Sequence, residues 1–160
     1  LVKIPFRPLT VALMAVAVSA AAAGCSSDSE SPNAEATAPA LPGTTWQLVS
    51  LQSMDDAQGA TPVPDPAKFT VTFDQNGTDA FFQLDCNRGK GTYTLEPGAD
   101  GSEGKLKFGP IATTMMMCPQ PSLDSQVGKA LSNVRTYLIK DDQLHLSQPA
   151  DAGVLTWKRG

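Results

Sequence analysis

The amino-acid sequence predicts a mainly β fold of the α+β class: about eight short antiparallel strands in a curled sheet or cracked barrel, with one helix between strands six and seven. Three observations support this prediction. Short segments alternate apolar and polar residues, turn-forming Gly, Asn and Pro residues separate them, and only one segment has helical spacing. Strands do not alternate with helices, which excludes a doubly wound parallel sheet.

The first predicted strand is 46–51, and a loop rich in Asp, Gly and Pro follows at 52–66. Residues 69–73 alternate apolar and polar side chains, as in a half-buried strand. Asn76-Gly77 predicts a tight hairpin turn because both residues tolerate positive φ angles. Residues 80–86 form the expected return strand.

The middle of the chain continues the strand pattern. Gly89-Lys90-Gly91 predicts a second turn or bulge, 96–104 is a polar loop, and Gly109-Pro110 predicts a strand break. The strands expected here are 92–95, 106–108 and 111–118. Met115, Met116 and Met117 are expected in the core, because consecutive strand residues face opposite ways and cannot converge on a soft metal ion.

The one helical segment is marked by apolar residues at helical spacing, after Pro119 and Pro121, where a missing N–H costs little. The apolar stripe consists of Leu123, Val127, Ala130, Leu131 and Val134. This helix is expected to cover or plug the barrel. Three final strands are expected at 137–139, 144–146 and 154–157, with Asp141-Asp142 as the turn between the first two.

The head of the chain predicts export. Lys3 and Arg7 precede the uncharged run 9–23, which is shorter than the ~20 apolar residues that span a bilayer. Residues 1–24 are therefore interpreted as a signal peptide. Ala22-Ala23-Gly24-Cys25 resembles a bacterial lipobox, which implies cleavage before Cys25 and a lipid, including fatty acids such as palmitate, on that residue. The alternative is an Ala-x-Ala cut at 21–23 that yields a soluble secreted protein.

The three cysteines favour the lipid anchor. Lipidation of Cys25 leaves Cys86 and Cys118 to form a disulfide in an oxidising compartment, whereas the alternative leaves an odd thiol. A redox-active pair is disfavoured because the two residues are not spaced as Cys-x-x-Cys. After the anchor, 25–43 is predicted to be a disordered tether, since it has no aromatic residue and one large aliphatic residue, Leu41.

The folded part is expected at 44–160, and its residue types give little support for catalysis. The single histidine, His145, lies between Leu144 and Leu146 and should point away from their face. Gly-x-Ser-x-Gly does not occur, and we expect no catalytic residue, metal site or cofactor. The chain has a net charge of −4, which argues against nucleic acid as a partner.

Asn87 and Arg88 directly follow Cys86 at an expected turn. Two interpretations of these residues remain open. Asn87 can satisfy the backbone of its own turn, because its side chain bonds locally and tolerates unusual φ angles. Alternatively, Asn87 and Arg88 are surface contacts for a ligand or partner.

Several motifs from residue 44 to 159 resemble the META domain family, also called HslJ-like. The most specific are Cys86-Asn87-Arg88-x-x-Gly91-x-Tyr93 and Thr113-Thr114-Met115-Met116-x-Cys118. The chain has Asp85 where the family often has Gly. The resemblance implies a cracked-barrel fold similar to that of secretin-pilot lipoproteins and a location in the bacterial envelope or outside the cell. It does not imply a catalytic reaction.

These observations together predict a monomeric, lipid-anchored protein on the extracytoplasmic face of the cell membrane or envelope. Its expected partners are the membrane, through Cys25, and another envelope protein, which the domain binds or supports. Two alternatives remain. One is a carrier that holds a small ligand or lipid in a barrel cavity lined by Phe, Leu and Met. The other is an envelope enzyme.

Overall fold

The computed structural model of the protein describes residues 40–53 and 59–160. It contains a helix, α1 (Asp124–Ser132), and two short 3-10 helices, Pro66–Lys68 and Pro149–Asp151. Its strands are β1 (Thr45–Ser53), β2 (Ala60–Pro62), β3 (Phe69–Phe73), β4 (Asp79–Leu84), β5 (Asn87–Pro97), β6 (Glu103–Phe108), β7 (Ala112–Thr113), β8 (Thr136–Lys140), β9 (Gln143–Ser147) and β10 (Gly153–Arg159).

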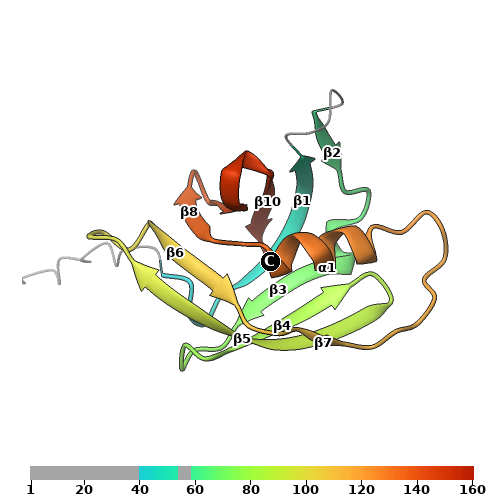
Figure 1. The fold of residues 1–160 in the computed structure, drawn as a ribbon, viewed down its shortest axis with the longest axis horizontal. Coiled ribbons are helices and arrows are strands. Elements are labelled where there is room, and N and C mark those ends of the chain that lie inside the picture. The colour runs from blue at the N-terminus through green and yellow to red at the C-terminus, as the bar shows by residue number, and fades with distance from the viewer. Residues whose placement is uncertain (1–39, 54–58) are drawn as a thin grey trace, which may run out of the picture. The chain divides into compact units, whose positions relative to one another are not determined.

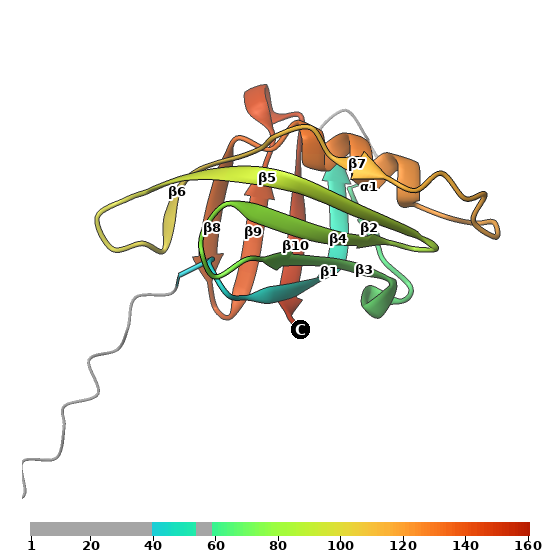
Figure 2. The same cartoon turned by 90° about the horizontal axis from the view of Figure 1, so that it is seen from below.

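Eight of these strands form a closed antiparallel barrel in the order β10-β9-β8-β6-β5-β4-β3-β1, and β1 pairs with β10 to close it. The predicted mainly β fold with one helix is therefore confirmed, and the barrel is closed. In Figure 2, β3, β4 and β5 cross in front of β8, β9 and β10, as expected for strands on opposite walls of a barrel. The short strands β2 and β7 pair with β1 and β5, respectively.

Strand β1 closes the barrel because it changes neighbours along its length. It pairs with β10 from Trp46 to Ser53, with an irregularity between Leu48 and Ser50. Its first residues also pair with β3, and the residues after the irregularity pair with β2. Bulges of this kind increase local twist and bend a strand. This bend lets a single strand serve both as a barrel wall and as the partner of β2.

The barrel interior is filled by side chains. Trp46 and Trp157 have no exposed area, and Phe73 packs edge-on against Tyr93 with ring centroids 5.1 Å apart. Phe108 contacts Phe73 in a stacked arrangement and Phe82 edge-on. Aromatic residues of this size contribute most of the buried apolar area of a small core.

Helix α1 lies between β7 and β8 in the chain and packs against β4 and β6. In Figure 1 it lies above β3 and β4. Val127, Ala130, Leu131 and Val134 are buried, so the predicted apolar stripe is confirmed. Leu123 is partly buried at the beginning of the helix. Among the residues described, no helix has both the length and the apolar character needed to cross a bilayer.

Two predictions in the middle of the chain are wrong. The strand expected at 111–118 is reduced to Ala112–Thr113, because beyond Thr114 the backbone bonds to a side chain, that of Asn87, instead of to a strand. The turn expected at Gly89-Lys90-Gly91 lies inside the uninterrupted strand β5. A Cβ at Gly91 would lie 3.1 Å from the Pro110 carbonyl oxygen, so this glycine permits a close backbone approach rather than a turn.

The hairpin turns also differ in detail. Between β3 and β4, Gly77 has φ +79°, and Asn76 does not have a positive φ, so the connection is not a two-residue Asn-Gly turn. The Asp74 carboxylate accepts a hydrogen bond from the Asn76 backbone N–H and shapes this longer loop. Between β8 and β9, Asp141 and Asp142 both have positive φ angles, as a two-residue turn requires.

The folded part begins before residue 44. Leu41 is 1% exposed, and the Gly43 N–H donates to the Phe73 carbonyl oxygen at 3.0 Å. Residues 41–43 of the predicted tether therefore pack on the barrel, because the one large aliphatic residue of that segment has a core site. The predicted signal peptide, the lipidation site Cys25 and tether residues up to 39 lie outside the described residues.

Candidate functional site

The site begins at the two-residue turn between β4 and β5. Leu84 pairs with Asn87, which leaves Asp85 and Cys86 as the turn. Asp85 has φ +56°, a left-handed conformation in which Gly is most favourable and Asp is tolerated. The Asp85 carboxylate lies 3.4 Å from the Lys68 ammonium group. The turn therefore accommodates the departure from the expected Gly.

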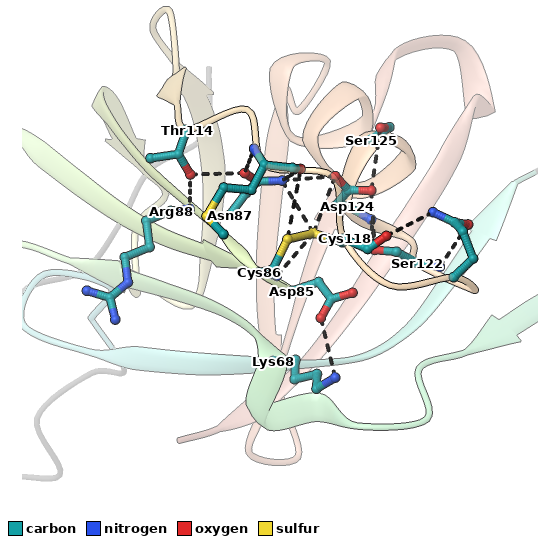
Figure 3. Close-up of a disulfide and its surroundings, with 12 residues drawn as sticks. Lys68, Asp85, Cys86, Asn87, Arg88, Thr114, Cys118, Ser122, Asp124 and Ser125 are labelled. Atoms are coloured by element: carbon teal, nitrogen blue, oxygen red, sulfur yellow. Dashed lines mark hydrogen bonds and ion pairs between the residues drawn. A yellow bond between two sulfur atoms is a disulfide. The ribbon is translucent and has the colours of Figure 1, made fainter.

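The predicted disulfide between Cys86 and Cys118 is present, with Cα atoms 5.5 Å apart (Figure 3). It links the β4–β5 turn to the segment that precedes α1. The two cysteines are 32 residues apart. Closing a loop of this length lowers the entropy of the unfolded chain and so stabilises the folded state by roughly 3–4 kcal/mol.

The Asn87 side chain is buried beside the disulfide, with 5% of the residue exposed. Its amide oxygen accepts bonds from the Met116 N–H at 2.7 Å and the Thr114 hydroxyl at 3.0 Å. Its amide nitrogen donates to the Met116 carbonyl oxygen at 3.0 Å and to the Asp124 carboxylate at 3.1 Å. Figure 3 shows Asn87 between Thr114 and Asp124.

This environment corrects the prediction for Asn87. The residue is not a surface contact, because its polar atoms are used inside the protein. It also does not only satisfy its own turn, since its partners lie 27 to 37 residues later in the chain. Arg88 is exposed and points away from this cluster in Figure 3, so it remains a candidate surface contact.

Residues 109–123, called the strap below, connect β6 to α1 and include β7. Met115, Met116 and Met117 lie on the strap and are 95%, 62% and 97% exposed. The prediction that these methionines belong to the core is wrong. It depended on a strand at these positions, whereas here Asn87 and the disulfide hold the strap with its thioether side chains in solvent.

A groove of about 570 Å³ lies between the strap and α1. Leu84 and Ile111 provide apolar lining, and α1 provides one charge of each sign, Lys129 and the Asp124 carboxylate that Asn87 binds. The three methionines also line it. The groove is therefore an apolar and polar surface outside the barrel interior, with thioether groups along one side.

The strap pairs with β5 along one backbone edge. The Thr114 N–H donates to the Arg88 carbonyl oxygen on β5 at 2.9 Å. Because backbone groups alternate along a strand, the N–H group of Thr113 in β7 points away from β5. In the described part of the chain, β7 pairs with β5 alone. Thr113 and Met115 are among the residues that line the groove.

The sequence offers one histidine, His145, as a candidate for acid–base chemistry. His145 is half-buried on β9, and its Nδ1 atom lies 3.3 Å from the Thr156 hydroxyl, while Leu144 and Leu146 are fully buried on the opposite face. Within residues 40–53 and 59–160, no group of three or more His, Cys, Asp and Glu side chains is placed to hold a metal ion.

The chain is similar to known proteins over most of its length. The family model of the META domain matches residues 39–160. A crystal structure of a DUF4847 family protein from Bacteroides vulgatus is similar, with a TM-score of 0.50 and 14% sequence identity. The similarity covers 74% of this chain and 93% of that one, and at this identity it concerns the fold alone. No curated protein sequence matches the chain.

Proposed function

Because the chain belongs to the META domain family, we propose that it is an exported, lipid-anchored envelope protein whose barrel binds another envelope protein without catalysing a reaction. The binding site in this proposal is the groove between the strap and α1. The observation that carries it is the placement of Met115, Met116 and Met117 in solvent on a backbone fixed by Asn87.

The anchoring part of the proposal is supported by sequence chemistry. The uncharged run 9–23 ends at a lipobox-like Cys25, and the remaining two cysteines form a disulfide, which is typical of an extracytoplasmic domain. More than one acyl chain at Cys25 would give stable attachment to a membrane. Residues 26–40 would then hold the barrel at a distance from the lipid surface.

The partner in this proposal is an extended segment that lies beside β7. An unpaired strand edge offers backbone hydrogen bonds to such a segment, and neighbouring pockets select its side chains. Leu84 and Ile111 suit an apolar side chain, and Lys129 suits an acidic one. Exposed Arg88, next to the strap, also favours an acidic segment.

The filled barrel interior favours this surface over the carrier alternative. A carrier needs an apolar cavity that encloses most of its ligand. Here Trp46, Trp157 and Phe73 occupy the interior with 1% exposure or less. The groove, by contrast, lies outside the barrel and has a mixed polar and apolar lining.

Lipid attachment is tested by the intact mass of the mature protein purified from its native membrane. The expected mass is that of a chain that starts at Cys25 and carries a diacylglycerol group. The Cys25→Ser variant should lack this group and leave the membrane fraction. A native protein that begins at Cys25 without any acyl mass would overturn the anchoring proposal.

Partner binding is tested by placing the photoreactive residue p-benzoylphenylalanine at Met117 in living cells. We expect a covalent adduct with one envelope protein, and the linked peptide should contain an acidic extended segment. The control position is exposed Lys158 on β10, which is four strands from β5 in either direction around the barrel. Equal adducts at both positions, or none at Met117, would contradict the proposed site.

A further inference from the structure

The sulfur atoms of the described residues fall into two chemical groups. Cys86 and Cys118 form the disulfide, whereas Met115, Met116 and Met117 carry thioethers in adjacent positions. The disulfide is already oxidised, so within the part of the chain that the structure describes, the thioethers are the sulfurs left for an oxidant. This arrangement puts the reactive sulfur on the strap.

We propose that the strap is a methionine oxidation site for hydroperoxides, with Met115 and Met117 as the fast positions and Met116 as the slow one. The order follows from exposure, since Met115 and Met117 are 95% and 97% exposed and Met116 is 62% exposed. Reactivity of a thioether depends on access of the oxidant to sulfur. The inference concerns the strap alone and stands whether or not the groove binds a partner.

The reaction transfers one oxygen atom. The sulfur lone pair attacks the terminal oxygen of the hydroperoxide, an S–O bond forms and the O–O bond breaks. Sulfur loses two electrons to become the sulfoxide, and the peroxide gains two electrons and leaves as an alcohol, or as water when the oxidant is hydrogen peroxide. The proton of the terminal oxygen passes to the leaving oxygen, so atoms and charge balance.

The strap tolerates this change because its fixed contacts do not involve the thioethers. The Met116 N–H and carbonyl group bond to Asn87, and Cys118 holds the end of the methionine run through the disulfide. A sulfoxide in a packed core disrupts it, but a sulfoxide in solvent loses no packing. Oxidation therefore leaves the barrel folded while it makes one side of the groove polar.

The test exposes the purified, disulfide-intact protein to hydrogen peroxide and follows each sulfoxide by peptide mapping. Met115 and Met117 should react within about threefold of the rate of N-acetylmethionine amide, with Met116 slower than both. The melting temperature of the oxidised protein should shift by less than about 1 °C, and methionine sulfoxide reductase should restore the original mass.

Matched variants make the assignment specific. At the strap, Met115→Leu with Met117→Leu should abolish the fast oxygen uptake and leave the slow uptake at Met116, as followed in the peptide that contains Met116. Met116→Leu should leave the fast uptake intact. Faster oxidation of Met116 than of its neighbours would overturn the proposal. Protection of Met115 and Met117 by tenfold or more relative to the reference, or unfolding on oxidation, would also overturn it.

Discussion

Asn87 links three parts of the molecule through a single amide group. It joins β5 to the strap through Thr114 and Met116, and to the first turn of α1 through Asp124. A buried polar group is stable only when its hydrogen bonds are made, and here both ends of the amide have partners. The residue type is also specific, because the amide must donate to one carboxylate and accept from one backbone N–H.

Replacing Asn87 by Ala should therefore destabilise the protein by about 2–4 kcal/mol, since it removes a buried amide that bonds the Met116 backbone, the Thr114 hydroxyl and the Asp124 carboxylate. Urea unfolding followed by tryptophan fluorescence measures this loss. The control is Asn76→Ala in the exposed β3–β4 loop, which should change stability by less than about 0.5 kcal/mol. Equal effects of the two variants would contradict the role given to Asn87.

The strap is positioned by glycines on the strand beneath it. A Cβ at Gly89 would lie 3.1 Å from side-chain atoms of Ile111 and Thr113, and one at Gly91 would lie 3.1 Å from the Pro110 carbonyl oxygen. Contacts this close are tolerated only when one partner moves. The two glycines thus let the strap pack closely on β5 because they lack a Cβ, although neither is a turn residue.

Gly91→Val should push the strap away from β5 and destabilise the protein by about 1–3 kcal/mol, despite the higher strand propensity of Val. The matched control is Thr94→Val at an exposed position of the same strand, which should be neutral or slightly stabilising. Thermal unfolding compares the two variants. If Gly91→Val were as stable as Thr94→Val, the strap would not depend on this close approach.

The elements that the sequence predicts well are those with local signals. Residues 69–73 alternate apolar and polar side chains strictly, and the stripe from Val127 to Val134 has helical spacing. Both patterns predict which face of the element is buried. The exposure of the three methionines could not be predicted from local sequence, because their position depends on Asn87, which is distant in sequence. Asn87 itself was singled out, but its burial results from strap and helix contacts that no local pattern encodes.

Two buried tyrosines of the barrel, Tyr93 and Tyr137, link its stability to pH. Tyr93 donates its hydroxyl to the Asp74 carbonyl oxygen, and Tyr137 donates to the Gly101 carbonyl oxygen. Burial, and to a smaller extent nearby carboxylates, raise the pKa of both phenols above the ordinary value of 10.0. The folded protein therefore retains these protons at pH values where the unfolded chain releases them.

Stability should consequently be unaffected by these two groups near pH 7 and should fall as pH rises above about 10, because the unfolded state then binds fewer protons. Urea unfolding from pH 8 to pH 11 measures this slope. Tyr93→Phe with Tyr137→Phe should lose about 1 kcal/mol for each hydrogen bond at pH 8 and show a shallower fall above pH 10. An unchanged slope in the double variant would contradict the assignment.

Closure of the barrel through β1 and β10 places the beginning and end of the folded part next to each other. Trp46 pairs with Arg159, whose guanidinium lies 4.7 Å from the Trp46 ring centroid, and the Gly160 N–H donates to the Thr45 carbonyl oxygen. A short linker between residues 160 and 41 would therefore span little distance. A circularly permuted chain opened at the β5–β6 loop would retain every barrel pairing, with its new termini at that loop.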